Sequence, residues 1–237
     1  MNVSLYQAAS ALNAMDRWQE TIAENLASTA APGFKKKEFF HTTIDAAMNQ
    51  KGVVGLGTNF SAGEMRLTNV KTDVAIDGKG FFEIQMPDGS LSYTRDGEFH
   101  VDSQGQLVTK QGFKVMGDGG PITLDLNNYT DLTVSASGEV SQGIDLKGRL
   151  RIVEFGNTNA LKRLNGTYFT AEDPATNPGP ATASSLRQGA LESANLSSST
   201  EMANLMTVMR IFEANQRMAQ IQDERIGRTI AELGSNT

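Results

Sequence analysis

Residues 200–233 read TEMANLMTVMRIFEANQRMAQIQDERIGRTIAEL, and this stretch decides the fold. Apolar side chains recur in it at alternating spacings of three and four residues, the a/d repeat of a helix that packs along one narrow seam. Its 34 residues predict a helix of roughly 50 Å at 1.5 Å per residue. Eight of the ten seam positions are apolar; the set is Met202, Leu205, Met209, Phe212, Gln216, Ala219, Asp223, Ile226, Ile230 and Leu233.

The N-terminal part of the chain repeats this pattern up to about Ala27, where Pro32 and Gly33 soon prevent a longer helix. A helix with a narrow apolar seam cannot bury it alone, so each end of the chain needs a partner. We expect the two ends to pair with each other and the pair to pack against other copies. The predicted assembly interface consists of Leu5, Leu12, Met15, Ile22 and Leu26 from the first helix and Met202, Leu205, Met209, Phe212, Ile226, Ile230 and Leu233 from the last.

The middle of the chain changes from a helical period to a period of two at about Thr72. Short β-rich runs such as 81–86, 91–95 and 99–101 alternate with Asp-Gly or Gly turns every eight to twelve residues, which is typical of antiparallel sheet with tight hairpins. The predicted fold class is therefore α+β. Long N- and C-terminal helices are expected to pair as a coiled-coil-like layer, with a central antiparallel all-β domain.

The same patterns predict how the chain divides into domains. Residues 1–34 and 190–237 are expected to form a terminal helical assembly domain. Glycines interrupt residues 35–71, which are expected to form an extended arm. Residues 72–189 are expected to form a β-rich outer domain. Before assembly supplies partners for the apolar seams, we expect the two ends of the chain to be mobile.

Composition limits the class of partner. The chain has 237 residues and a net charge of −6, which argues against nucleic acid, since phosphate binding needs a dense basic surface. The one basic cluster, Lys35-Lys36-Lys37, reads as a solvated stretch, with a local docking contact as the alternative. The chain has no cysteine, so it forms no disulfide or thiolate metal site, and this composition suits a protein that is exported unfolded.

Targeting signals are missing from the sequence. The first seven residues, MNVSLYQ, have no positive segment and no apolar core, so no secretory signal peptide is expected. No stretch approaches the roughly 20 apolar residues that span a bilayer, so membrane insertion is not expected. If the protein works outside the cytoplasm, it leaves by a route that ignores such signals.

No motif predicts catalysis. His41 and His100 lie in different segments, and neither has the spacing of a zinc-binding pair. The chain contains no G-x-S-x-G motif, and residues 77–80, DGKG, lack the spacing of a phosphate-binding loop. Carboxylates beside glycines are typical of turns, with a calcium loop as the alternative. We predict no catalytic residue, no cofactor and no metal ligand, although a carbohydrate-cleaving carboxylate pair stays open as an alternative.

Three blocks of sequence resemble the bacterial flagellar rod and hook family of axial proteins. Residues 24–35, ENLASTAAPGFK, are similar to the family's N-terminal signature N-L-A-N-x-x-T-x-G-F-K, departing at Ser28 and Ala31. The middle and C-terminal blocks follow in the family's order. The signature residues are Asn25, Leu26, Gly33, Phe34, Gly80, Phe81, Phe82, Tyr93, Thr94, Arg95, Gly97, Leu191, Glu192, Asn195, Arg210 and Glu213.

The resemblance implies a structural, non-enzymatic subunit of the basal-body rod that polymerises into a helical tube and transmits torque. In such a tube the terminal helices form an inner layer and the β domain lies outside. Its partners would be copies of itself, other flagellar axial proteins and the flagellar type III export apparatus. Its location would be the periplasmic rod of the basal body, reached without a cleaved signal peptide.

The position within the rod is the finer part of this interpretation. Residues 35–73 form a short segment, whereas the resemblance implies a longer insertion there in distal-rod proteins and a much larger outer domain in hook proteins. Residues 117–122 and 148–153 are also more similar to the proximal-rod member. We favour the proximal rod, with a distal-rod or hook-type protein as the alternative. Outside the family, the alternatives are a free-standing coiled-coil stalk and a peptidoglycan-cleaving enzyme.

Overall fold

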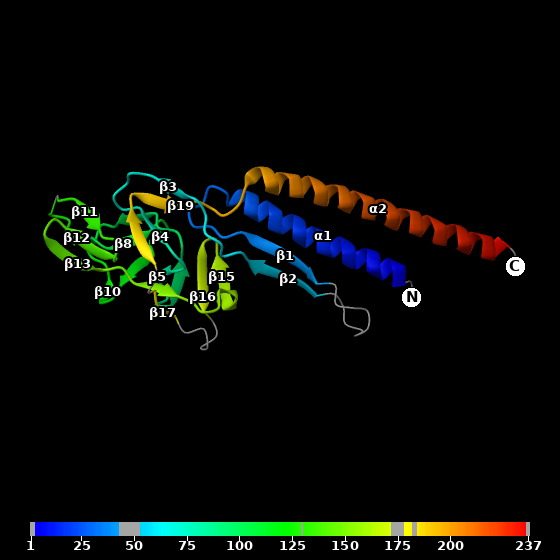
Figure 1. Cartoon of the computed structure of the whole chain (residues 1–237). Coiled ribbons are helices and arrows are strands. Elements are labelled where there is room, and N and C mark those ends of the chain that lie inside the picture. Colours follow the sequence, from blue (N-terminus) through cyan, green and yellow to red (C-terminus); the bar gives the residue numbers. More distant parts are fainter. Residues whose placement is uncertain (1–2, 43–52, 129, 172–177, 182–183, 236–237) are drawn as a thin grey trace. The chain divides into compact units, whose positions relative to one another are not determined.

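The computed structural model describes residues 3–42, 53–128, 130–171, 178–181 and 184–235 (Figure 1). Two long helices, α1 (Val3–Ala27) and α2 (Ser198–Ser235), lie near the ends of the chain. The described residues between them form strands, loops and one 3-10 turn, η2 (Thr158–Ala160). Strands already begin at Lys37, well before the period change that the sequence shows at about Thr72.

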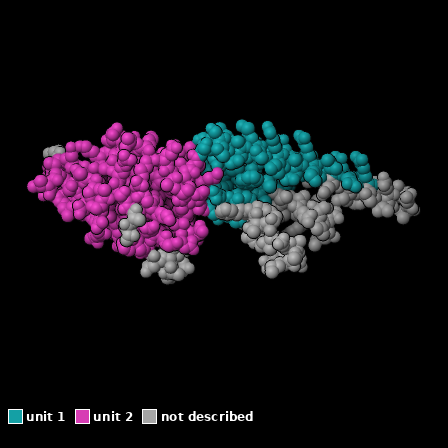
Figure 2. All heavy atoms as spheres, in the orientation of Figure 1, with its two compact units in different colours: residues 1–27, 37–57, 197–237 teal, residues 28–36, 58–196 magenta. Residues whose placement is uncertain are grey.

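Contacts within the chain divide it into two compact units, coloured teal and magenta in Figure 2. Unit 1 consists of residues 1–27, 37–57 and 197–237, and unit 2 consists of residues 28–36 and 58–196. The chain passes from one unit to the other four times. The predicted domain boundaries, 1–34 with 190–237, 35–71 and 72–189, stay a prediction.

Unit 1 combines the two helices with a pair of strands. α1 and α2 contact each other, and β1 (Lys37–Thr42) pairs with β2 (Val53–Thr58). β1 also contacts α1, where the rings of Trp18 and Phe39 stack at a centroid distance of 5.9 Å. Part of the predicted extended arm is thus a two-stranded sheet that belongs with the helices.

Only part of the predicted seam of α2 is covered within the chain. Val208 is completely buried, whereas Met202 is 48% exposed and Met209 is 46% exposed. Glu201 is buried and Phe212 is half-buried, so the buried stripe has the predicted spacing but is rotated by about one residue at its start. A rotation of one residue is roughly 100° in a helix with 3.6 residues per turn. Sequence spacing alone did not distinguish the two stripes, because apolar residues occupy both.

The predicted fold class is therefore wrong as stated. The prediction was a layer of two long terminal helices paired like a coiled coil around one antiparallel all-β domain. The helices are present, but they are the only two α-helices in the described residues, and a strand pair packs with them. The β part consists of several separate sheets rather than one. The physical reason is that period-2 patterns identify strands without specifying which strands pair.

The largest sheet of unit 2 has the order β15–β16–β6–β5–β9–β8–β7, and neighbouring strands in this order pair antiparallel. The strands are β15 (Leu161–Asn165), β16 (Tyr168–Ala171), β6 (Leu91–Thr94), β5 (Phe81–Gln85), β9 (Lys114–Gly117), β8 (Leu107–Thr109) and β7 (Phe99–Val101), with β10 (Gly120–Pro121) on β9, β14 (Ile152–Glu154) on β5 and β17 (Gly179–Pro180) on β14.

Three smaller antiparallel sheets complete unit 2. One contains three strands, and the other two join residues far apart in the sequence. Through these two pairings, the residues that precede α2 are held against residues that follow β2. The strands are β11 (Leu132–Val134), β12 (Glu139–Gln142) and β13 (Asp145–Arg149); β18 (Ser185–Gln188) with β4 (Val74–Asp77); and β19 (Ala190–Glu192) with β3 (Met65–Leu67).

Two adjacent phenylalanines on β5 divide the core of unit 2. Successive side chains of a strand point to opposite faces. Phe82 packs in a cluster with Val74 and Phe99, whereas Phe81 packs in a second cluster with Tyr93 and Phe169. Phe82 and Phe99 meet edge to face at 5.0 Å, and Phe81 meets Phe169 at 6.1 Å. The central strand is therefore buried on both faces.

Substitution of Gly97 tests this packing. A Cβ at Gly97 would lie 1.7 Å from the carbonyl oxygen of Val74, so the backbone of unit 2 must shift to admit it. We expect Gly97→Ala to lower the free energy of unfolding by about 1–3 kcal/mol, as overpacking does. Gly156→Ala is the control, because a Cβ there meets nothing within 4 Å. Urea unfolding monitored by circular dichroism measures both, and equal stability of the two variants would contradict the prediction.

Candidate functional site

Ionisable side chains gather in unit 2 where three segments of the chain meet. Among the described residues, no group of three or more His, Cys, Asp or Glu side chains is arranged to hold a metal ion. Neither helix, over its described residues, has the length and apolar character needed to cross a membrane.

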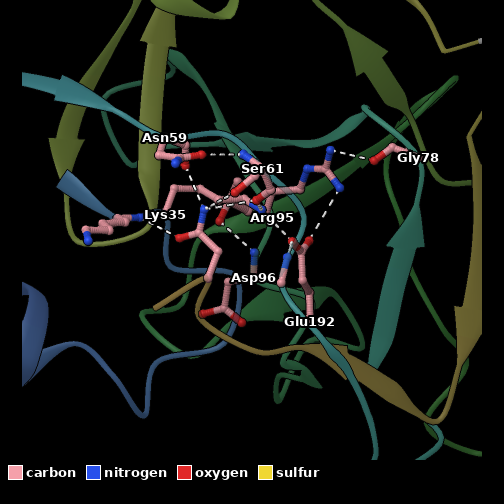
Figure 3. A network of polar contacts seen from close by, with 11 residues as sticks. Lys35, Asn59, Ser61, Gly78, Arg95, Asp96 and Glu192 are labelled. Carbon is pink, nitrogen blue, oxygen red and sulfur yellow. Dashed lines mark hydrogen bonds and ion pairs between the residues drawn. The ribbon is translucent and has the colours of Figure 1, made fainter. Parts of the chain in front are cut away.

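Glu192, the last residue of β19, is the centre of a buried charge cluster (Figure 3). Its carboxylate forms an ion pair with Lys35 and lies 3.4 Å from Nη1 of Arg95. The side chains of Lys35, Glu192 and Arg95 are 0%, 2% and 4% exposed. Lys35 comes from the segment after α1, and Arg95 directly follows β6. In sequence they lie 157 and 97 positions from Glu192.

Backbone groups supply further hydrogen bonds to this cluster, although the buried Nε of Arg95 has no hydrogen-bond partner. The Nζ of Lys35 donates to the carbonyl of Ser61 at 2.8 Å, and Nη2 of Arg95 donates to the carbonyl of Gly78 at 2.7 Å. The amide of Gly63 donates to Oε1 of Glu192 at 2.8 Å. A buried ion pair is favourable only when such bonds compensate the lost hydration. The cluster therefore fixes backbone positions as well as charges.

Burial controls the ionisation of the two cations. Desolvation lowers the pKa of Lys35, and the adjacent Glu192 carboxylate opposes this effect. Desolvation likewise lowers the pKa of Arg95, against the raising effects of Glu192 and Glu154. In both cases the nearby carboxylates offset part of the cost of burying the positive charge. Removing Glu192 would leave two buried cations without their common partner.

Arg163 of β15 also contacts the segment that contains Lys35. Its guanidinium lies 4.7 Å from the ring centroid of Phe34 and 4.9 Å from that of Phe169. It also donates to the carbonyls of Lys35 and Gly166. A guanidinium between two aromatic faces is a favourable cation–π arrangement. Phe34 is thereby anchored beside the second core cluster of unit 2.

The conformation of Gly33 allows the segment after α1 to approach the backbone of Arg95 closely. Its φ of +65° is in the left-handed region that favours glycine, and a Cβ there would lie 2.3 Å from the carbonyl carbon of Arg95. The amide of Gly33 donates to the carbonyl of Glu192 at 2.7 Å. The backbones of the N-terminal segment and of β19 are therefore hydrogen-bonded directly.

Asn195 extends the cluster toward residues 59–61. Its Oδ1 accepts from the amide of Lys36 at 2.6 Å, and its Nδ2 donates to the carbonyls of Asn59 and Ser61 at 2.8 and 3.0 Å. The amide of Asn195 also donates to the carbonyl of Phe34 at 3.3 Å. One side chain thus bridges three segments. We call Lys35, Asn59, Ser61, Arg95, Glu192 and Asn195 the junction cluster.

Asn25 makes a similar connection within unit 1. Its Oδ1 accepts from the amide of Lys37 at 2.9 Å, while its Nδ2 donates to the carbonyl of Lys37 at 2.9 Å. The same Nδ2 lies 3.5 Å from Oε2 of Glu201. The asparagine side chain therefore connects α1, β1 and α2.

The signature residues that the sequence singled out gather mainly in unit 2. Gly33, Phe34, Arg95, Glu192 and Asn195 meet around the junction cluster. Four other members lie within two residues of a group in this network: Thr94 and Gly97 near Arg95, Leu191 beside Glu192, and Gly80 near Gly78. Phe81, Phe82 and Tyr93 lie in the two apolar clusters. In unit 1, Asn25 is buried and Leu26 half-buried, whereas Arg210 and Glu213 are exposed on α2.

The predicted interface residues differ in exposure. Ile22 is buried, and Leu12, Met15, Leu26, Leu205 and Phe212 are half-buried. Met202 and Met209 are exposed, and the side chains of Leu5, Ile226, Ile230 and Leu233 lie outside the described part of the structure. Their contribution to assembly stays a prediction.

Sequence reasoning misassigned one residue and missed others. Lys35 was expected in a solvated basic stretch, but its side chain is completely buried because Glu192 and a backbone carbonyl compensate its charge. The clue was its place in the signature block, next to Phe34. Arg163 and Asn59 carried no such clue, since their partners come from distant segments.

Comparison with known proteins adds evidence of a different kind. Residues 75–142 match the family model described as the flagellar hook protein FlgE/F/G D1 domain, and residues 187–232 match that of the flagellar basal body rod FlgEFG protein C-terminal region. The flagellar basal-body rod protein FlgG of Borreliella burgdorferi is 34% identical and aligns with 94% of this chain and 96% of its own length. FlgF of Caulobacter vibrioides is 31% identical over 99% of both chains.

The buried charges make a direct prediction about Glu192. We expect Glu192→Met to destabilise unit 2 by about 3–5 kcal/mol, because it leaves Lys35 and Arg95 buried without their carboxylate. The double variant Lys35→Met/Glu192→Met should lose less, since one buried cation is removed with its partner. Glu98→Gln is the control, because its ion pair with Lys110 is exposed and long at 3.8 Å. Urea unfolding measures all three, and a double variant that is as unstable as Glu192→Met, or more so, would contradict the prediction.

The buried carboxyl of Asp96 predicts a pH dependence. Desolvation raises its pKa from 3.8 to about 6, while a hydrogen bond from the amide of Glu98 opposes this effect. The folded protein thus keeps a proton between about pH 4 and 6 that the unfolded chain releases, so stability falls as the pH rises through this range. A shift of about two units corresponds to roughly 3 kcal/mol.

Asp96→Asn isolates this effect, because the amide oxygen still accepts the Glu98 hydrogen bond without titrating. Relative to the wild type, we expect this variant to gain up to about 3 kcal/mol of stability between pH 4 and pH 7. Chemical unfolding at several pH values measures the difference between the two proteins. A difference that stays constant across this range would mean that Asp96 titrates normally.

Proposed function

Because the chain belongs to the flagellar basal-body rod protein family, we propose that it transmits torque as a stacked subunit of the proximal rod. The predicted family resemblance is confirmed, and the chain is a structural subunit of the flagellar basal body that assembles with other axial proteins. The family is structural, so the prediction that the chain is not an enzyme is confirmed as well. The position in the rod and the mechanism of assembly are the proposed parts.

A short segment after α1 supports the proximal position. Only 39 residues, 35–73, separate Phe34 from Val74, where the resemblance implies a longer insertion in distal-rod proteins. The alignments with the Borreliella FlgG and the Caulobacter FlgF span 258 and 245 positions, more than the 237 residues of this chain, so each relative has residues without a counterpart here. The smaller excess with FlgF agrees with a chain that lacks a long insertion.

The exposed face of α2 carries the proposed assembly. Met202, Met206 and Met209 are all about half exposed and lie at spacings of four and three, on one side of the helix. Apolar side chains gathered on one helix face are typical of interaction surfaces. The proposed occupant is the terminal helices of neighbouring axial subunits. Head-to-tail contacts that do not close generate a filament, as a rod requires.

Export and location belong to the same proposal. The chain has no cysteine. This composition suits export in an unfolded state through the flagellar type III apparatus, followed by assembly in the periplasmic part of the basal body. The net charge of −6 gives no support for a nucleic-acid partner.

Substitution of Met209 tests the assembly surface. Because this side chain is exposed, we expect Met209→Asp to leave the circular dichroism and thermal unfolding of the purified subunit nearly unchanged. In the filament the buried charge would recur in every subunit, so cells that carry only this variant should lack rods and motility. Gln104→Asp, on an exposed turn of unit 2, is the control and should swim normally.

Soft-agar motility and electron microscopy of isolated basal bodies provide the two readouts. Intact rods with Met209→Asp would show that this face of α2 is not in an interface. A closed small oligomer of the wild-type chain that never enters a filament would instead favour a free-standing stalk.

A further inference from the structure

Unit 2 contains a cavity of about 740 Å³ whose described lining residues lie outside the junction cluster. Its walls include the loop after α1, the segment between β3 and β4, and the turns that follow β8 and β15. All of these lining residues belong to unit 2. Sites for small ligands typically measure roughly 300–1,000 Å³, so the cavity is large enough to hold one.

Three carboxylates line this cavity together. Asp73 and Glu98 lie directly opposite each other in an antiparallel bridge, and side chains at such positions share one face. Asp96 precedes Glu98 by two residues and lines the same cavity. Asp73 is 5% exposed and Asp96 is 8% exposed. Two acidic side chains that are almost completely buried therefore border the same space.

The charges of these two aspartates are not matched by a cation of the described chain. Glu98 is paired with Lys110 at 3.8 Å, and Asp96 accepts a hydrogen bond from the amide of Glu98 at 3.0 Å. Within the described residues, neither aspartate forms an ion pair, and no group donates to the carboxylate of Asp73. Arg66 lines the cavity without pairing with either of them. Buried carboxylates in this state favour the binding of a cation.

The rings that line the cavity favour a guanidinium over an ammonium group. Phe113 and Tyr168 both border it and meet edge to face at 5.4 Å. A guanidinium stacks on aromatic faces and reaches two carboxylates with its planar set of donors, whereas an ammonium is a compact, strongly hydrated charge. Arg95 already combines these contacts elsewhere in unit 2, with Glu192 at 3.4 Å and the ring of Phe81 at 5.0 Å.

We propose that this cavity binds an arginine side chain that another polypeptide presents to unit 2. The guanidinium pairs with Asp73 and Asp96, and its aliphatic stem packs against apolar lining residues such as Pro32 and Met86. The ion pairs supply the missing counter-charge for the two aspartates. The proposal does not rest on the proposed function, since the cavity lies in unit 2 and the assembly surface lies on α2 of unit 1.

Nuclear magnetic resonance titration of the full-length chain, at a concentration below self-association, tests the site. The probe is N-acetylarginine amide, and the expected result is a saturable shift of the backbone amide signals of Asp73, Asp96, Glu98 and Phe113. N-acetylcitrulline amide has nearly the same shape without the charge and should bind at least about tenfold more weakly. N-acetyllysine amide should also bind more weakly. No saturable shift, or equal binding of either analogue, would overturn the proposal.

Asp73→Asn tests whether the buried carboxylate carries the binding. This substitution keeps the shape of the side chain and the backbone bonds to Val70 and Gly189, so unit 2 should fold as before. We expect the affinity for N-acetylarginine amide to fall about tenfold, as the loss of one charge-assisted interaction does. Asp118→Asn is the matched control, because it removes the same charge from an exposed position outside the cavity. Equal affinities of the two variants would contradict the site.

The wild-type chain provides a further test that needs no variant. Desolvation raises the pKa of Asp96 to about 6, so this carboxylate is largely charged at pH 7.5 and largely protonated at pH 5. The other charged or titratable groups of the lining are Arg66, Asp73, Glu98, Lys110 and Tyr168. We expect N-acetylarginine amide to bind about fivefold more weakly at pH 5 than at pH 7.5. The same affinity at both pH values would overturn the role of Asp96, and none of these outcomes bears on the motility of Met209→Asp cells.

Discussion

The structure of unit 2 depends on compensating one buried carboxylate. Glu192 ends a short strand where it has almost no access to water, so its charge requires nearby cations. Lys35 and Arg95 supply them from two distant segments, and each cation also donates a hydrogen bond to a backbone carbonyl. Because all these groups must be present together, the segment after α1 and the segment before α2 are fixed on the same β scaffold.

This constraint explains why the signature residues have such different chemistries. Gly33 allows two backbones to approach, and Phe34 packs against the Arg163 guanidinium. The side chain of Asn195 forms hydrogen bonds with backbone groups of Lys36 and Asn59, which lie outside regular secondary structure. None of them carries out a reaction. In a protein of the rod family, the function is mechanical, and a buried polar cluster with many directional bonds resists displacement in several directions at once.

The two units differ in how much of their apolar surface is buried within the chain. Unit 2 is complete in itself, with two apolar clusters on either side of β5. Unit 1 leaves methionines of α2 exposed, and flexible, polarisable side chains of this kind adapt well to neighbouring helices. This combination suits a subunit that joins a filament, because unit 2 can fold before the interface forms.

The sequence by itself determined the two long helices, the β-rich middle and the family, because periodicity and local motifs are properties of neighbouring residues. Only the tertiary structure decided which stripe of α2 is buried, since Val208 and Met209 satisfy the same spacing and only contact with the rest of unit 1 distinguishes them. It also decided the environment of Lys35. A lysine in a run of three reads as solvated, and its burial follows from Glu192, which lies 157 residues away on β19, the strand that pairs with β3.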